Sequence, residues 1–153
     1  LVKGVIAVSY SIDEIYDLFV WDAQLSDEEY DARVQKGIDA AKQIKNLLPF
    51  MRPIILPPKK SKSVWEPCAK VIVMRSDEEL QPFIFQLLQW IADPNWPGAL
   101  LIYNRLTQMP YTSIESALHF SRTQAERKND SGWLSMLDDL NQDMINRQNS
   151  WMI

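Results

Sequence analysis

The chain has 153 residues, of which 46% are hydrophobic and 24% charged, a composition typical of one folded globular domain and unlike that of a disordered chain. Its formal net charge is −4, so it lacks the basic excess that drives nonspecific binding to nucleic acids and to anionic membranes. A single cysteine, Cys68, cannot form an internal disulfide, and no run of about 18 apolar residues could span a membrane. We therefore expect a cytoplasmic protein that binds neither nucleic acid nor a membrane.

A recurring pair of residues marks the expected helix starts. In a capping box, a Ser or Thr hydroxyl accepts a hydrogen bond from the backbone N–H three residues later, and a Glu at that position reaches back to the N–H of the cap. Four pairs have this spacing: Ser11/Glu14, Ser26/Glu29, Ser76/Glu79 and Thr112/Glu115. Nine prolines and only four glycines punctuate the apolar runs, which favours helices joined by proline-marked turns.

Apolar residues recur at helical spacing along most of the chain. This periodicity predicts helices over residues 12–20, 27–48, 63–75, 76–92, 97–107, 113–127 and 133–147. Gly37 lies in the middle of the second helix and indicates close packing against a neighbour. Pro67 fits a first helical turn, Pro82 should kink or restart its helix, and Pro97 should be the first residue of the next one. Residues 71–74 could also be read as a strand, but their flanks favour a helix.

The predicted helices and short turns indicate how the chain is organised. Short connections, such as the turn over residues 93–97, place successive helices antiparallel. We therefore expect an all-α fold in which antiparallel pairs stack as a short HEAT/armadillo-like right-handed α-α superhelix. Residues 51–62, which contain three prolines, are the best candidate for an internal boundary. They are apolar enough to pack, so we predict one domain over residues 1–153.

The middle of the chain resembles a known family. The residues that carry the resemblance are Trp65, Glu66, Cys68–Val71, Ser76–Leu80, Pro82, Leu87, Leu88, Trp90 and Asn95–Ala99. From Trp65 to Leu106 the chain resembles an uncharacterised family of small, bacterial, all-helical, HEAT-like proteins. The resemblance implies a helical fold and brings no established activity. By analogy alone, some small bacterial domains of this style are suspected immunity or partner proteins.

The residues suited to catalysis are few. His119 is the only histidine, and we expect it to be a partly buried structural residue. Cys68 is expected to pack against a neighbouring helix, and nothing in the spacing supports a nucleophilic pair with His119. The four separated glycines exclude the standard phosphate-binding loops. We therefore expect no catalytic residue, no metal site and no cofactor.

Two groups of residues are candidates for binding. Trp90, Asn95 and Trp96 surround the turn over residues 93–97, where exposed aromatic rings would form a binding hot spot. In the alternative interpretation, Trp96 closes the turn and Trp90 packs beneath it. Asp139 and Asp143, with Asp138 beside them, are four residues apart on one helix. Two such carboxylates can hold a divalent cation or share a proton, although a solvated helix face is the favoured explanation of them.

These observations favour a non-catalytic protein–protein interaction module with an unknown protein partner. An immunity-type protein that binds a basic enzyme through acidic helix faces is one concrete version. The alternative is a carboxylate-based, Mg²⁺-dependent enzyme centred on Asp139 and Asp143. Nucleic-acid recognition on a helical-repeat scaffold is a third hypothesis, which the net charge disfavours. Self-association through Trp151 and Ile153 is also a hypothesis.

Overall fold

The computed structural model describes residues 9–51 and 62–150, and in these ranges all regular structure is helical. The elements are α1 (Ile12–Phe19), α2 (Asp27–Ala41), η1 (Leu48–Phe50), η2 (Lys62–Val64), α3 (Trp65–Val73), α4 (Asp77–Leu80), η3 (Gln81–Phe83), α5 (Ile84–Trp90), α6 (Ala99–Thr107), α7 (Tyr111–Arg127) and α8 (Ser131–Ser150). The predicted all-α class is confirmed. Most of the predicted boundary segment 51–62, as well as Trp151 and Ile153, lies outside the described residues.

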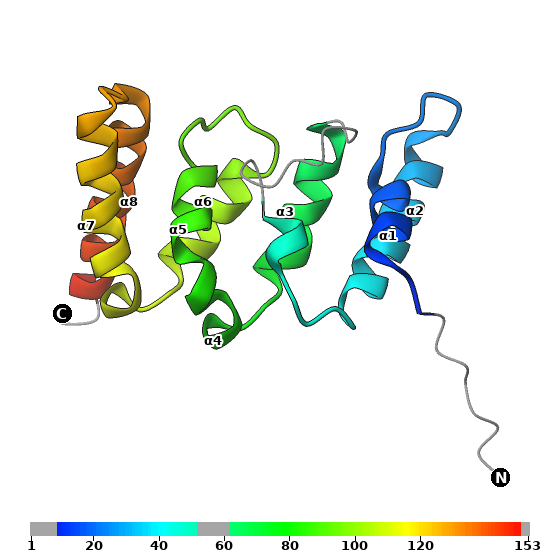
Figure 1. The fold of residues 1–153 in the computed structure, drawn as a ribbon, viewed down its shortest axis with the longest axis horizontal. Helices are drawn as coiled ribbons and strands as arrows, with labels where there is room; N and C mark the ends of the chain where they lie inside the picture. The colour runs from blue at the N-terminus through cyan, green and yellow to red at the C-terminus, as the bar shows by residue number, and fades with distance from the viewer. Residues whose placement is uncertain (1–8, 52–61, 151–153) are drawn as a thin grey trace, which may run out of the picture.

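The helices stand side by side in a row, with α1 and α2 at one end and α7 and α8 at the other (Figure 1). Along the row α1 packs on α2, α2 on α3 and α3 on α6. Beyond α6, α5 packs on both α6 and α7, α6 also reaches α8, and α7 packs on α8. One continuous set of buried apolar side chains follows this row, and its largest members include Phe19, Phe50, Trp65 and Trp90. None of the described helices has the length and apolar character needed to cross a membrane.

Three of the four predicted capping boxes are confirmed. At Ser11, Ser26 and Ser76 the hydroxyl accepts from the backbone N–H of the glutamate three residues later, and that glutamate accepts from the backbone of the cap. The fourth prediction is wrong, because Thr112 lies inside α7, whose N-cap is Pro110. The Ser113 backbone N–H already donates to the Pro110 carbonyl at 3.0 Å, so the helix starts before the threonine.

The second helix ends earlier than predicted. It stops at Ala41, whereas the periodicity favoured residue 48. The guanidinium of Arg75, which follows α3, donates to the carbonyls of Ala41 (2.7 Å) and Ile44 (2.8 Å). The chain then turns Leu47 into the core, where it is 1% exposed. The Ala41 carbonyl also accepts from the Ile44 backbone N–H at 2.9 Å, in a tighter turn than that of an α-helix, so the turn and an arginine from another element together close the end of α2.

The three prolines singled out in the sequence behave differently. Pro67 lies in the first turn of α3, as predicted. Pro82 lies in η3, which separates α4 from α5 and confirms the predicted restart. Pro97 is not the first helical residue, because α6 begins at Ala99 after Gly98 in the left-handed conformation (φ 82°). Residues 71–73 belong to α3, so the helical interpretation of that segment was right.

Gly37 provides the close approach that the sequence indicated between two helices. A Cβ atom at this position would lie 2.6 Å from Cε1 of Phe19 and 3.2 Å from Cβ of Leu18, both in α1. Phe19 is fully buried, so its ring has no free space into which to move. The distance between α1 and α2 therefore depends on the missing side chain.

We predict that Gly37→Ala destabilises the protein by up to about 2 kcal/mol. The overlap with Phe19 costs about 1–3 kcal/mol, and the better helix propensity of alanine returns about 1 kcal/mol. Urea unfolding at neutral pH measures the difference. Gly132→Ala in α8 is the control, because its nearest atom outside the helix backbone is 3.7 Å away. A Gly37→Ala protein as stable as the Gly132→Ala protein would contradict the close contact.

Candidate functional site

The predicted aromatic site at the α5–α6 connection is a packed cluster. Trp90 is fully buried, and its indole Nε1–H donates to the Pro97 carbonyl at 3.0 Å. Trp65 of α3 lies between the other two tryptophans, with ring centroids 6.4 Å from Trp90 and 5.7 Å from Trp96, both edge to face. Trp96 is half-buried, and Asn95 is exposed at the tip of the turn. The cluster therefore fixes the turn onto α3.

The expectation that Trp90 offers an exposed ring to a partner is not met, because its side chain lies in the core. The geometry is that of the alternative interpretation, in which Trp90 packs beneath the turn. Gly98 is required there, since a Cβ atom would lie 2.6 Å from Cβ of Ala69 and 3.2 Å from Cζ2 of Trp90. Only Asn95 and part of Trp96 remain accessible from this group.

The predicted carboxylate pair lies on an exposed face of α8. Asp143 accepts a hydrogen bond from the Tyr103 hydroxyl of α6. Burial, followed by this hydrogen bond and the negative charges of Asp143 and Asp139, raises the pKa of Tyr103 well above its ordinary value. Asp138 points elsewhere, with its Oδ1 2.7 Å from Nε of Arg122 on α7. Asp139 and Asp143 therefore act together on one tyrosine, and Asp138 does not join them.

The other residues considered for catalysis or metal binding are also not gathered into one site. Within residues 9–51 and 62–150, no three His, Cys, Asp or Glu side chains are grouped so that they could hold a metal ion. Cys68 is fully buried in α3, as expected. His119 is exposed on α7, which corrects the expectation of partial burial. The buried thiol and the exposed imidazole thus lie in different environments on different helices.

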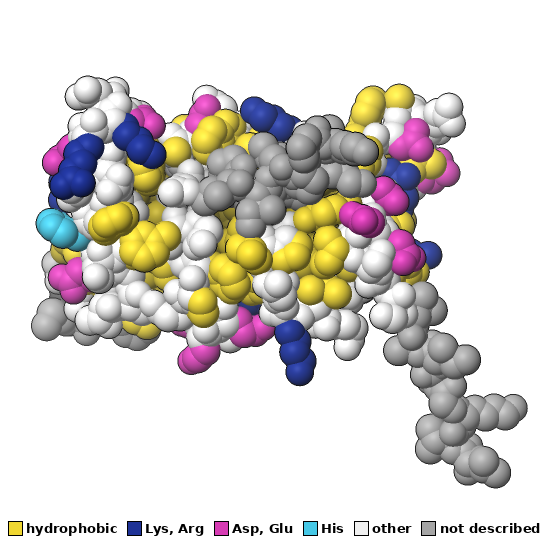
Figure 2. Space-filling view, in the orientation of Figure 1, with side chains coloured by type: hydrophobic (Ala, Val, Ile, Leu, Met, Phe, Trp, Pro, Cys, Tyr) yellow, Lys and Arg dark blue, Asp and Glu magenta, His cyan; other side chains and the backbone are white. Residues whose placement is uncertain are grey.

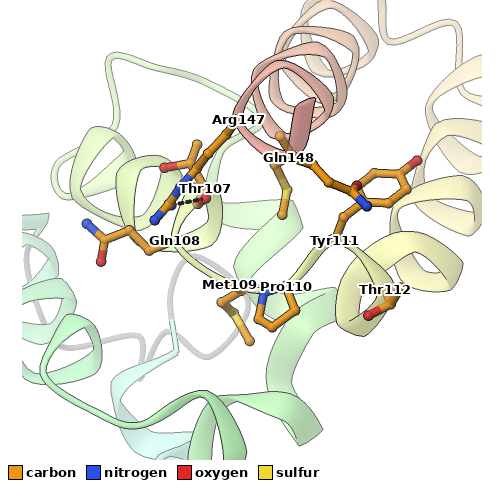
Figure 3. Close-up of a pocket in the computed structure, with 9 residues that line it drawn as sticks. Thr107, Gln108, Met109, Pro110, Tyr111, Thr112, Arg147 and Gln148 are labelled. Atoms are coloured by element: carbon orange, nitrogen blue, oxygen red, sulfur yellow. Dashed lines mark hydrogen bonds between the residues drawn. The ribbon is translucent and has the colours of Figure 1, made fainter. Parts of the chain in front are cut away.

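A cleft of about 340 Å³ opens where the α6–α7 turn meets the end of α8 (Figure 3). Its walls include Met109, Pro110, Tyr111 and Gln148, together with Arg147. The Arg147 guanidinium donates to the Thr107 carbonyl near the end of α6 and so serves to cap that helix. The Tyr111 hydroxyl donates to the side chain of Asn141 at 2.9 Å. The polar side chains of this cleft thus hold the last three helices together.

Sequence reasoning missed an exposed aromatic pair. Phe85 of α5 and Phe120 of α7 are 45% and 52% exposed, and their rings meet edge to face with centroids 5.3 Å apart. Figure 2 shows hydrophobic side chains at the surface over α7 and α5. Apolar residues occur on most sides of α5 and its flanks, from Phe83 to Ile91, so the sequence did not single out Phe85. Phe85 lies about 100° around the helix from Ile84, and this offset from the buried stripe was the available signal.

Comparison with known proteins places the chain in a family. A family model described as "Domain of unknown function (DUF5071)" matches residues 56–153. The chain belongs to the DUF5071 family. Neither a curated protein nor a solved structure matches it. The resemblance to an uncharacterised family is thereby confirmed, and the function of this family is unknown. The DUF5071 match includes α3–α8 and the Phe85–Phe120 pair, and it begins inside the predicted boundary segment 51–62.

The raised pKa of Tyr103 predicts a pH dependence of stability. Unfolded tyrosine loses its proton near pH 10, whereas folded Tyr103 keeps it to higher pH. The folded state therefore binds more protons above pH 10, and the free energy of unfolding must fall as the pH rises through that range. Tyr103→Phe should make this fall shallower, as measured by urea unfolding at pH 9 and pH 11.

Asp143→Asn is the matched variant, because its amide oxygen still accepts the hydrogen bond while the negative charge is removed. It should also reduce the slope above pH 10 without the loss of the tyrosine ring. If the free energy of unfolding falls above pH 10 as steeply in both variants as in the wild type, the Tyr103–Asp143 contact does not affect the proton affinity of the phenol.

Proposed function

We propose that this DUF5071 protein is a non-catalytic protein–protein interaction module that presents the face formed by α5 and α7 to a protein partner. In this proposal the helix pairs stack in the manner of HEAT or armadillo repeats, as a right-handed superhelix that offers extended surfaces. The observation that carries the proposal is the exposed contact between Phe85 and Phe120. The two rings come from different helices, so a partner that covers them must contact both.

The exposed pair is a source of binding free energy. A phenylalanine side chain offers roughly 200 Å² to solvent. Since each ring is about half exposed, close to 200 Å² of aromatic surface remains available in all. Covering it contributes about 5 kcal/mol before the costs of association. Aromatic side chains at the centre of an interface typically provide such anchoring contacts.

The surroundings of the pair support a protein partner. From Leu80 to Ala92 the sequence contains no charged residue, and Gln81, Gln86 and Gln89 are the polar side chains of this stretch. Interface cores combine enrichment in aromatic residues with depletion of charged ones. The α5 side of the face has this composition.

Binding is favoured over catalysis because the side chains that could perform chemistry make structural contacts. Asp143 is bonded to Tyr103, Asp138 is paired with Arg122, and Cys68 lies in the core. An immunity-type protein that masks a basic enzyme is the form of this function that acidic helix faces favour.

The function is tested by replacing Phe120 with the photoreactive analogue p-benzoylphenylalanine in cells of the source organism. We expect irradiation to attach a distinct second protein, identified by mass spectrometry, at position 120. The same analogue at Leu100 of α6 is the control, because this apolar side chain is 58% exposed and comes from another helix.

The cross-link should be prevented by Phe85→Ala, which removes half of the aromatic pair and leaves the photoreactive group in place. Docking on this face would be contradicted if positions 100 and 120 gave the same adduct. It would also be contradicted if the adduct at position 120 still formed in the Phe85→Ala protein. Adducts made only of the protein itself would instead indicate self-association.

A further inference from the structure

The most exposed of the large hydrophobic side chains reported for the described residues is at the opposite end of the row. Trp21, in the connection between α1 and α2, is 59% exposed. Within residues 9–51 and 62–150 its indole is the largest hydrophobic side chain exposed to this extent. Such a ring is a candidate anchor for a partner, since Trp is enriched among the residues that dominate binding energies.

The backbone around Trp21 is held in place by side chains from other elements. Its N–H donates to the Ser63 hydroxyl of η2 at 3.1 Å. The Val20 carbonyl accepts from the guanidinium of Arg33, and the Phe19 carbonyl accepts from the Tyr30 hydroxyl at 2.6 Å. Because these contacts already fix the loop, covering the indole would cost little additional ordering of the backbone.

The indole borders an open cleft of about 380 Å³ that carries carboxylates. Asp17, Asp22 and Arg33 line the cleft together with Val20 and Trp21. The guanidinium of Arg33, in α2, lies 3.8 Å from the carboxylate of Asp22 and donates to the Val20 carbonyl in the α1–α2 connection. An aromatic face beside carboxylates is the arrangement that receives an arginine or lysine side chain, through cation–π and ionic contacts together.

The charged side chains are distributed unevenly along the chain, which its net charge of −4 does not reveal. Residues 9–41, which include α1 and α2, carry nine acidic side chains and two basic ones (Arg33 and Lys36), a net charge of −7, whereas the rest of the chain carries eleven acidic and fourteen basic side chains, a net charge of +3. The nine are Asp13, Glu14, Asp17, Asp22, Asp27, Glu28, Glu29, Asp31 and Asp39. Figure 2 shows acidic side chains gathered over the α1–α2 end of the row. This end therefore attracts a cationic partner.

We propose that the α1–α2 end is a second docking surface, which binds a basic polypeptide segment by placing an arginine or lysine of that segment over the exposed indole of Trp21, beside Asp17 and Asp22. The inference rests on the proposed interaction function and names the chemistry of a second surface. The α1–α2 end stands away from α5 and α7 in the row of helices, so this surface is separate from the Phe85–Phe120 face (Figure 1).

The proposal is tested by titrating the full chain with a fluorescein-labelled oligoarginine peptide at low ionic strength, with fluorescence anisotropy as the readout. We expect saturable binding that weakens with added salt, and no binding of an oligoglutamate peptide of equal length. In a ¹⁵N–¹H correlation spectrum, the Trp21 indole signal, assigned by its absence in Trp21→Phe, should shift most among the tryptophan indoles. Oligoarginine binding that leaves the Trp21 indole signal unshifted would overturn the proposal.

Matched variants separate this surface from the general effect of charge. Trp21→Ala and the pair Asp17→Asn/Asp22→Asn should each weaken oligoarginine binding by about tenfold. The pair Glu126→Gln/Asp139→Asn removes the same charge from the α7–α8 end and should change binding less than about twofold. Equal losses from the two pairs, or no loss from Trp21→Ala, would overturn the proposal.

Two further outcomes are decisive. Phe85→Ala/Phe120→Ala should bind oligoarginine as the wild type does, so a failure of the α5–α7 face and a failure of the Trp21 surface are distinguishable. Sedimentation of the protein tests whether a second copy of the chain occupies this surface instead. If the wild type forms a dimer that Trp21→Ala abolishes and that added oligoarginine does not dissociate, the surface binds a second copy and the proposal of a basic partner is overturned.

Discussion

The packing of Trp65 against two other tryptophans is the contact on which the middle of the row depends. Trp65 comes from α3, Trp90 from α5 and Trp96 from the turn that leads to α6, so one edge-to-face cluster joins three elements. The bond from the Trp90 indole to the Pro97 carbonyl fixes the turn, and the left-handed Gly98 lets the backbone lie directly against Ala69. Because α6 starts from this turn and also contacts α8, the cluster determines where the second half of the row begins.

Arginine side chains supply hydrogen-bond donors to carbonyls at helix ends, which apolar side chains cannot do. The last carbonyls of a helix lack partners within it. Arg75 serves this role at the end of α2, and Arg147 serves it near the end of α6. Arg105 of α6 donates to the Arg75 carbonyl at 2.9 Å and to Asp77 at 2.7 Å, which ties α6 to the start of α4. These three arginines, which could be mistaken for active-site residues if each were considered alone, thus connect neighbouring helices.

The surfaces that remain differ in physical character. The α5–α7 face combines two exposed phenylalanines with α5, a helix that has no charged residue, so apolar burial dominates the contacts that the α5 side can make. The α1–α2 end combines an exposed indole with a concentration of carboxylates, so contacts made there are screened as the ionic strength rises. A row of helices keeps such surfaces apart, because α1 and α2 stand at one end of it and α7 at the other (Figure 1).

The sequence by itself determined the features that depend on neighbours along the chain. Three capping boxes follow from side-chain to backbone hydrogen bonds within one turn, and the positions of Pro67 and Pro82 follow from the N–H that proline lacks. Periodicity was sufficient to identify the all-α class. Tertiary structure alone decided where α2 ends, because the carbonyls of Ala41 and Ile44 are bonded to Arg75, more than thirty residues away. It also decided that Trp90 is buried while Phe85, five residues earlier on the same helix, is exposed. Both residues are aromatic members of one apolar helix, and only the positions of α3, α6 and α7 around that helix determine which of its sides reaches water.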